Sequence, residues 1–280
     1  MKLYRDCGSE IFNTGTSKCP FEPEFIDKII LTPKDMELSV EELETEIVKL
    51  THANRPDRLY AIGPIGEYAP SGGEAQTTKN GYGASKITSY SELVEKWTMQ
   101  NYDMGLYNNL LGLKNEIMRA MYIDRNGVLY CEQSKVGKVR GYELSAVYPS
   151  GARFKTSGAS AALEVNLVYK DVERAWINST MIMLDQSVAD ELTGLVWVDV
   201  KKIGSSGTNY KVVEHYGAFD ATEMYGTLLG KSEAWSNVTT ASYNAADGTL
   251  SLTATSGQEP KLKSPADLLT AGIKGIEQWS

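Results

Sequence analysis

Histidine and cysteine are scarce in this chain, so chemistry that depends on either residue has few candidates. The 280 residues include 2 His and 3 Cys. Cys7, Cys19 and Cys131 are odd in number and widely spaced, which argues against a disulfide framework and favours synthesis in a reducing compartment. With His52 they come nearest to a metal-ligand set, but they lack the paired spacing of a zinc site. We therefore expect no metal and no cofactor, and we interpret the cysteines as small hydrophobes.

A complete catalytic signature is also missing. A serine nucleophile needs an activating base, usually histidine, and His52 and His215 are the candidates. Residues 158–162 (Gly-Ala-Ser-Ala-Ala) are similar to a nucleophile elbow but lack its second glycine. Residues 81–86 (Gly-Tyr-Gly-Ala-Ser-Lys) complete neither a dinucleotide-binding nor a Walker phosphate loop. We therefore predict that the protein is not an enzyme and has no catalytic residues.

Long apolar runs and an excess of basic residues are absent as well. No segment approaches the roughly 20 apolar residues of a membrane-spanning helix, and the first residues lack the apolar stretch of about 7–15 residues of a signal peptide. The formal net charge is -8, whereas a general nucleic-acid-binding surface needs clustered Lys and Arg. An acidic wall repels DNA and lets it slide past. We therefore expect no membrane and no specific contact with DNA.

Short β-rich segments dominate what the chain does contain. Asn126-Gly127 and Asp247-Gly248 are typical of tight hairpins, because glycine adopts positive φ readily. The pattern predicts an α+β fold that is mostly β, with a β-sandwich or barrel-like main domain and a small immunoglobulin-like β-sandwich after it. The strands that we predict cover residues 25–31, 122–123, 128–131, 139–148, 161–169, 176–184, 195–200, 210–213, 238–243 and 249–254.

The order of these patterns predicts three parts. Residues 1–22 are rich in Gly, Ser, Thr, Asn and Pro without any period, which favours an extended N-terminal arm. Residues 23–216 form the β-rich main domain, with helices near 40–52 and 103–121. Residues 225–280 form the small C-terminal β-sandwich module, which we expect to be separable.

The two helices rest on different signals. Residues 39–42 (Ser-Val-Glu-Glu) have the spacing of a capping box, which marks the start of a helix. The second helix rests on leucines and methionines at helical spacing, and Gly105 and Gly112 weaken it. Two further segments stay open between alternatives: residues 87–98 fit a strand or a short helix, and residues 185–192 fit a turn or one helical turn.

Residues 63–85 form the long loop that we predict inside the main domain. The segment is rich in Gly and Pro with few aliphatic residues, and a loop of more than about 12–15 residues in a compact domain is usually functional. Tyrosine offers apolar area with a polar tip. We therefore predict inter-subunit contacts at Gly72, Gly73, Tyr82 and Tyr68.

Residues 25–32, 122–130 and 262–277 carry a resemblance to known proteins. With the arm, the helix-interrupted β-domain, the Gly-rich loop and the terminal module, the chain resembles tail tube and related ring proteins of tailed bacteriophages, in the style of phages of Bacteroides-like hosts, including crAss-like phages. The resemblance implies a structural subunit of the virion, made in the host cytoplasm. It implies a tail tube or head-to-tail ring, partnered by other virion proteins, in which copies self-associate around a lumen that DNA crosses without specific binding.

Two other classes stay open from the sequence. A carbohydrate-binding or adhesin-like surface β-sandwich is supported by the 16 tyrosines but opposed by the lack of a signal peptide. An enzyme is opposed by the missing catalytic signature. Particle size separates the three classes, since only a ring-forming subunit gives rings or tubes.

Overall fold

The computed structural model describes residues 23–79, 81–99, 102–114, 116–151, 153–158, 160–204 and 208–279. The expected arm over residues 1–22, with Cys7 and Cys19, lies outside these residues. The described chain divides into two compact units. The second unit consists of Lys49–Tyr60, Asp103–Asn109 and Thr193–Ser280, and the first contains the rest.

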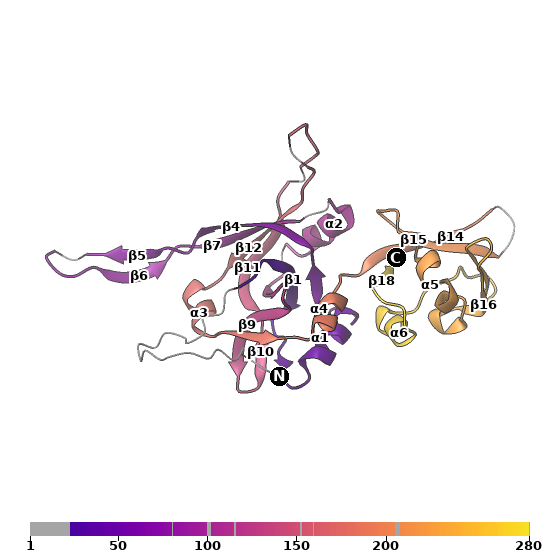
Figure 1. The fold of residues 1–280 in the computed structure, drawn as a ribbon, viewed down its shortest axis with the longest axis horizontal. Coiled ribbons are helices and arrows are strands. Elements are labelled where there is room, and N and C mark those ends of the chain that lie inside the picture. The colour runs from indigo at the N-terminus through magenta and orange to yellow at the C-terminus, as the bar shows by residue number, and fades with distance from the viewer. Residues whose placement is uncertain are drawn as a thin grey trace. The chain divides into compact units, whose positions relative to one another are not determined.

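The first unit is built on a branched antiparallel sheet (Figure 1). Its strands are β1 (Ile26–Pro33), β2 (Leu38–Ser39), β3 (Tyr60–Ile62), β4 (Ile65–Gly72), β7 (Leu93–Met99), β8 (Met118–Asp124), β9 (Val128–Lys135), β10 (Lys138–Arg140), β11 (Tyr142–Pro149), β12 (Glu164–Tyr169) and β13 (Ser179–Met183). Strand β8 pairs with β1 along its length, while β9 and β11 pair with successive parts of β8. The sheet therefore divides at β8 into one branch through β9 and another through β11 to β7 and β4.

The burial pattern of the strands follows from this branching. Every residue of β8 is buried, because the strand lies in the middle of the sheet. Strand β7 alternates instead, with Leu93, Glu95, Trp97 and Met99 buried and the residues between them partly exposed. The described chain is thus α+β and mostly β, which confirms the predicted class.

The helices are short and differ in part from the prediction. Before residue 193, the described helices are α1 (Leu43–Thr51), α2 (Met104–Gly112), α3 (Val172–Ile177) and α4 (Gln186–Glu191). Helix α1 forms where a helix was expected. The predicted capping box does not form, because Ser39 lies in β2 and the backbone N–H of Ser39 donates to Glu46 Oε2 at 3.2 Å. The helix predicted over 103–121 ends at Gly112, since the apolar run after it is the buried strand β8. A fully buried strand lacks the alternation that distinguishes it from a helix.

Both predicted tight hairpins are confirmed. Gly127 has a φ of 78° between β8 and β9, and Asp124 Oδ1 accepts the N–H groups of Asn126 and Val128, each at 2.9 Å. Gly248 has a φ of 60° between β16 (Val238–Asn244) and β17 (Thr249–Ala254). Both turns are local, since each depends on a glycine at positive φ and on residues next to it in the sequence.

The second unit contains one sheet in the order β16-β17-β15-β14-β18, with helices packed on it. Its other elements are β14 (Val196–Lys202), β15 (Asn209–Glu214), β18 (Ile276–Gln278), α5 (Ala221–Leu229), α6 (Pro265–Thr270) and the 3-10 helix η1 (Ser232–Ala234). Asp220 caps α5, since its side chain accepts the N–H groups of Thr222 and Glu223. Buried side chains of the sheet, such as Val198 and Leu250, pack with Leu229 of α5.

The boundary expected between residues 216 and 225 does not divide the structure. Strands β14 and β15 precede that boundary but belong to the second unit, because β15 pairs with both β14 and β17. The predicted main domain over 23–216 therefore includes two strands that belong to the second unit. The core of this unit lies between a sheet and helices, where an immunoglobulin-like β-sandwich was expected over 225–280.

Glycine is required where α5 packs on β16. A Cβ on Gly226 would lie 2.4 Å from Cε2 of Tyr243, which is closer than van der Waals contact. We expect Gly226→Ala to lower the free energy of unfolding by about 1–3 kcal/mol, as overpacking does. Chemical denaturation of the parent and the variant measures this difference in the free energy of unfolding. Gly112→Ala is the control, because a Cβ there meets nothing within 4 Å; equal losses in the two variants would contradict the packing argument.

Candidate functional site

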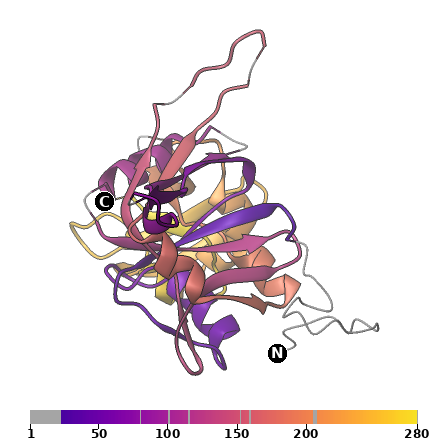
Figure 2. The same ribbon diagram turned by 90° about the vertical axis from the view of Figure 1, so that its left-hand side faces the viewer.

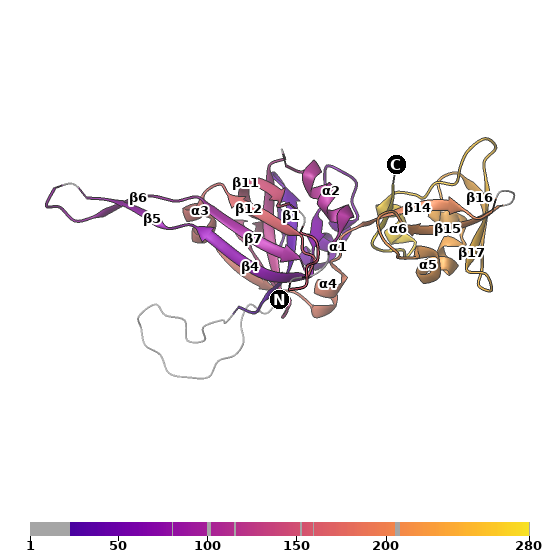
Figure 3. The same ribbon diagram turned by 90° about the horizontal axis from the view of Figure 1, so that it is seen from above.

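The segment predicted as a loop over 63–85 consists mostly of strands. Strand β4 pairs with β7, and β5 (Ala75–Thr78) pairs with β6 (Lys86–Tyr90). Figures 1 and 3 show this two-stranded ribbon, β5 and β6, extending beyond the ends of β4 and β7. All described residues of both ribbon strands are exposed. The prediction failed because strands exposed on both faces carry no hydrophobic alternation.

Gly72 and Gly73 form the joint between β4 and the ribbon. Their φ angles are 81° and 79°, in the left-handed region that favours glycine. A Cβ on Gly72 would lie 1.9 Å from the carbonyl oxygen of Glu92, so the two backbone segments that lead into the ribbon approach closely here. Beyond the joint, Glu74 N donates to Ser91 Oγ and Ser91 N donates to Glu74 O, both at 2.9 Å. The joint is therefore a defined turn.

The ribbon carries large apolar side chains outside any core. Tyr82 is fully exposed at the turn, Ile87 is 60% exposed and Tyr90 is 39% exposed. The exposed apolar area of these side chains stays in water, so it contributes nothing to the stability of the unit that carries them. They become favourable only when another surface covers them.

Strand β4 adds an exposed sheet edge beside the ribbon. It is the last strand in its branch of the sheet, and no described strand pairs with its other edge. Seven of its eight residues are exposed, after a buried Ile65. Pro70 cannot donate a backbone hydrogen bond, which limits uncontrolled pairing at such an edge. The edge and the ribbon together form one continuous exposed surface.

Tyr68, the fourth predicted contact residue, has a different environment. Its ring stacks on Trp97 with centroids 4.2 Å apart, and its hydroxyl donates to Glu95 Oε1 at 3.0 Å. The structure thus places Gly72, Gly73 and Tyr82 on the ribbon and Tyr68 in a cavity wall. Sequence reasoning missed Glu95 and Trp97, although their alternation with Leu93 along β7 is visible in the sequence.

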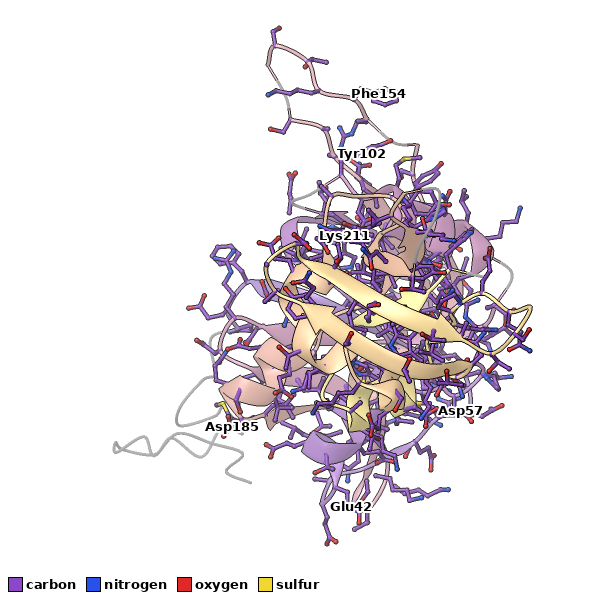
Figure 4. The ribbon with its side chains drawn as sticks, turned by 90° about the vertical axis from the view of Figure 1, so that its right-hand side faces the viewer. Glu42, Asp57, Tyr102, Phe154, Asp185 and Lys211 are labelled. Atoms are coloured by element: carbon purple, nitrogen blue, oxygen red, sulfur yellow. The ribbon has the colours of Figure 1, made fainter. Side chains whose placement is uncertain are left out.

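A second projection leaves the first unit between β11 and β12 (Figure 2). Arg153 and Ala162 exchange backbone hydrogen bonds at 3.1 Å near its base. Phe154 on this projection is 78% exposed, and its ring centroid lies 6.1 Å from that of Tyr102. Both residues are labelled in Figure 4. Of the candidate nucleophile segment 158–162, the described residues Gly158 and 160–162 lie on this projection and belong to no helix.

The histidines and the described cysteine are occupied in structural contacts. His52 lies in the second unit, where its Nδ1 contacts Thr51 Oγ1 at 3.0 Å and its Nε2 accepts the N–H of Gly275 at 3.1 Å. His215 Nδ1 contacts Asp199 Oδ1 at 2.8 Å. Cys131 is buried in the first unit, and burial raises the pKa of its thiol to about 12, which keeps it unreactive.

The described part of the chain has neither a cluster of metal-ligating side chains nor a membrane-spanning helix. Across these residues, His, Cys, Asp and Glu side chains form no group of three or more that could hold a metal ion. Among the described helices, none has the length and apolar character needed to cross a membrane.

No protein-family model matches the sequence, and no curated protein is significantly similar to it. Among solved structures, the chain is similar to the cryo-EM structure of the anti-feeding prophage cap, the AFP tube terminating cap, with a TM-score of 0.29 and 10% identity over 62% of this chain and 100% of that one. It is also similar to the anti-feeding prophage baseplate, with a TM-score of 0.23 and 12% identity over 60% of this chain and 98% of that one.

Proposed function

We propose that this chain is a structural subunit of a phage-like virion that self-associates into rings around a DNA conduit, as a tail tube or head-to-tail ring protein. The observation that carries the proposal is the exposed ribbon of β5 and β6. An isolated two-stranded hairpin is only marginally stable in water, and its ordering costs conformational entropy. A neighbouring subunit that covers Tyr82, Ile87 and Tyr90 offsets that cost by burying their apolar area.

The outer edge of β4 supplies a second contact of a different kind. Its unpaired backbone groups are able to accept a strand from a neighbouring copy, which extends the sheet across the subunit boundary. Main-chain hydrogen bonds give such a contact its direction, and the ribbon beyond Gly73 lies next to it along the chain. A continuous sheet that passes from copy to copy by the same contact closes into a ring when the rotation between copies closes after a whole turn, and otherwise gives an open filament.

The charge of the protein suits a conduit for DNA. The net charge of -8 gives long-range repulsion of phosphate. We propose that DNA passes the ring without specific binding. Other virion proteins are the remaining partners that we propose.

Self-association of the purified chain tests the proposal. We expect sedimentation velocity to show a discrete species several times heavier than the monomer as concentration rises from micromolar to millimolar, and negative-stain microscopy to show rings of uniform diameter. A protein that stays monomeric throughout this range, in both low and physiological salt, would refute ring formation.

A further inference from the structure

The first unit has an open cavity of about 680 Å³ next to the start of β4. It lies between strands β4, β7, β8, β9, β11 and β12 and the start of β1. Seven of its fifteen lining residues are aromatic, and three carboxylates line it with one basic residue, Arg125. Its wall includes Glu67, Tyr68, Glu95, Trp97, Tyr122 and Tyr169. A cavity of this size holds a small ligand or a large side chain.

A buried carboxylate lies in the wall of this cavity. Glu95 is only 3% exposed. Its Oε2 accepts the hydroxyls of Tyr122 at 2.6 Å and Tyr169 at 3.3 Å, and its Oε1 accepts that of Tyr68. These are neutral donors, so they stabilise the carboxylate without neutralising its charge.

Glu95 differs from the other buried glutamates in lacking a basic partner. Glu132 pairs with Arg119 and Arg140, and Glu164 pairs with Lys96. Over the described residues, no Lys, Arg or His forms an ion pair with Glu95. Burial accordingly raises the pKa of Glu95, against the opposing effect of the tyrosine hydroxyls. Buried charges in proteins are normally paired. Glu132 and Glu164 follow this rule, whereas Glu95 has no basic partner among the described residues.

A second polar group in the same wall is also unsatisfied. Trp97 is 3% exposed, and its Nε1 has no hydrogen-bond partner among the described residues. The indole lies close enough to Glu95 to help lower the pKa of that carboxyl, but without the geometry of a hydrogen bond. The Trp97 ring is held between Tyr68 at 4.2 Å and Tyr122 at 5.4 Å. Its N–H therefore requires an acceptor from outside the described chain.

We propose that this cavity binds an organic cation, an alkylammonium or guanidinium group that pairs with Glu95 and carries a carbonyl or hydroxyl acceptor for Trp97 Nε1. The tyrosine rings favour a cation further, because the faces of aromatic rings attract positive charge. Glu67 at the rim attracts the same charge. A bare metal ion fits less well, since hard cations need several oxygen ligands in one place and the described residues offer no such group.

Binding of two matched probes tests this proposal. Nα-acetyl-arginine amide provides a guanidinium and amide carbonyls, and Nα-acetyl-citrulline amide is its neutral counterpart of the same shape. In isothermal titration calorimetry at neutral pH, we expect the full chain to bind the arginine probe at least tenfold more tightly than the citrulline probe. Equal binding of the two probes, or no binding of either, would refute the cation site.

Substitution of Glu95 locates the effect. Glu95→Gln keeps the shape and one acceptor oxygen but removes the charge and replaces the other oxygen by an NH2 donor, so we expect the preference for the arginine probe to disappear. Glu67→Gln is the matched control, because Glu67 is an exposed rim carboxylate and its loss should leave most of the preference intact. A preference that survives in Glu95→Gln would assign the cation to another part of the surface. The midpoint of thermal unfolding of each variant checks that the fold is intact.

The cation has two chemical sources, which the same variant separates. If it is a side chain of a neighbouring copy, Glu95→Gln should also weaken self-association, and the arginine probe should compete with it. If it is a free small molecule, self-association should be the same in the variant and the parent. The proposal does not depend on ring formation, because probe binding is measured on the monomer as well.

Discussion

Replacing residues 73–92 with a two-residue Asn-Gly turn is expected to abolish self-association while leaving the monomer as stable as the parent. Gly72 and Leu93 face each other in the β4–β7 pair, so a short turn is able to join them directly. The replacement removes only exposed ribbon residues and the joint. Shortening a loop also lowers the entropy cost of closing it. The measurements are the melting temperature and sedimentation velocity at the concentration where the parent assembles.

Two substitutions separate the apolar surface of the ribbon from its mere length. Tyr82→Ser combined with Ile87→Thr keeps the ribbon but removes exposed apolar area, and we expect weaker self-association. Val136→Ser is the matched control, because Val136 is 97% exposed but lies in the turn between β9 and β10. Assembly of the shortened chain at the level of the parent would show that the ribbon is a passive feature and that the proposed function is wrong.

The sequence predicted well the features that depend on a few neighbouring residues. The hairpin turns at Gly127 and Gly248 formed as expected, because positive φ is a property of the residue itself. Helix α1 formed near its predicted place, since its apolar residues face one side. The mostly β class followed from the sum of many such local signals.

Features that depend on distant pairing were missed. Strands β4 and β5 lie in the segment 63–85 that the sequence predicts as a loop, because their residues are exposed; only the pairing of β4 with β7 and of β5 with β6 orders them. The division between the units depends on the pairing of β15 with β17, which no local pattern encodes. The alternation along β7 places Glu95 on the buried face of the strand, but its partners Tyr122 and Tyr169 come from other strands, so no local pattern identifies the site.

The second large effect concerns a buried ionic network in the first unit. Arg119 is 4% exposed and Glu132 is 2% exposed, and Arg119 Nη1 donates to Glu132 Oε2 at 3.2 Å. Arg119 also donates to the carbonyl oxygens of Lys34 at 2.7 Å and Gly141 at 3.0 Å. The guanidinium therefore satisfies several buried acceptors that lie on different strands and turns.

A carboxylate at the margin of this network gives it a pH dependence. The hydrogen bond from Lys170 lowers the pKa of Glu143 below its ordinary value against the opposing effect of burial, and the charge of Arg119 lowers it further. A carboxyl with a depressed pKa in the folded state contributes stability that is present at neutral pH and lost as the pH falls through that pKa. Removing Arg119 should therefore reduce the loss of folding free energy on acidification, because the pKa of Glu143 is lowered less in the variant.

Arg119→Ala is expected to lower the free energy of unfolding of the first unit by about 3–5 kcal/mol, the usual cost of removing one partner of a buried ion pair. The cost arises because Glu132 and the two carbonyls stay buried with fewer partners. Arg119→Lys should fall between alanine and the parent, because an ammonium keeps the charge but cannot reproduce the fork of the guanidinium. Arg174→Ala is the matched control: Arg174 lies 3.9 Å from the same Glu132, but its side chain is 55% exposed, and an exposed pair contributes at most about 1 kcal/mol. Urea denaturation followed by circular dichroism measures all three variants, and similar small losses for Arg119→Ala and Arg174→Ala would show that burial does not make Arg119 special.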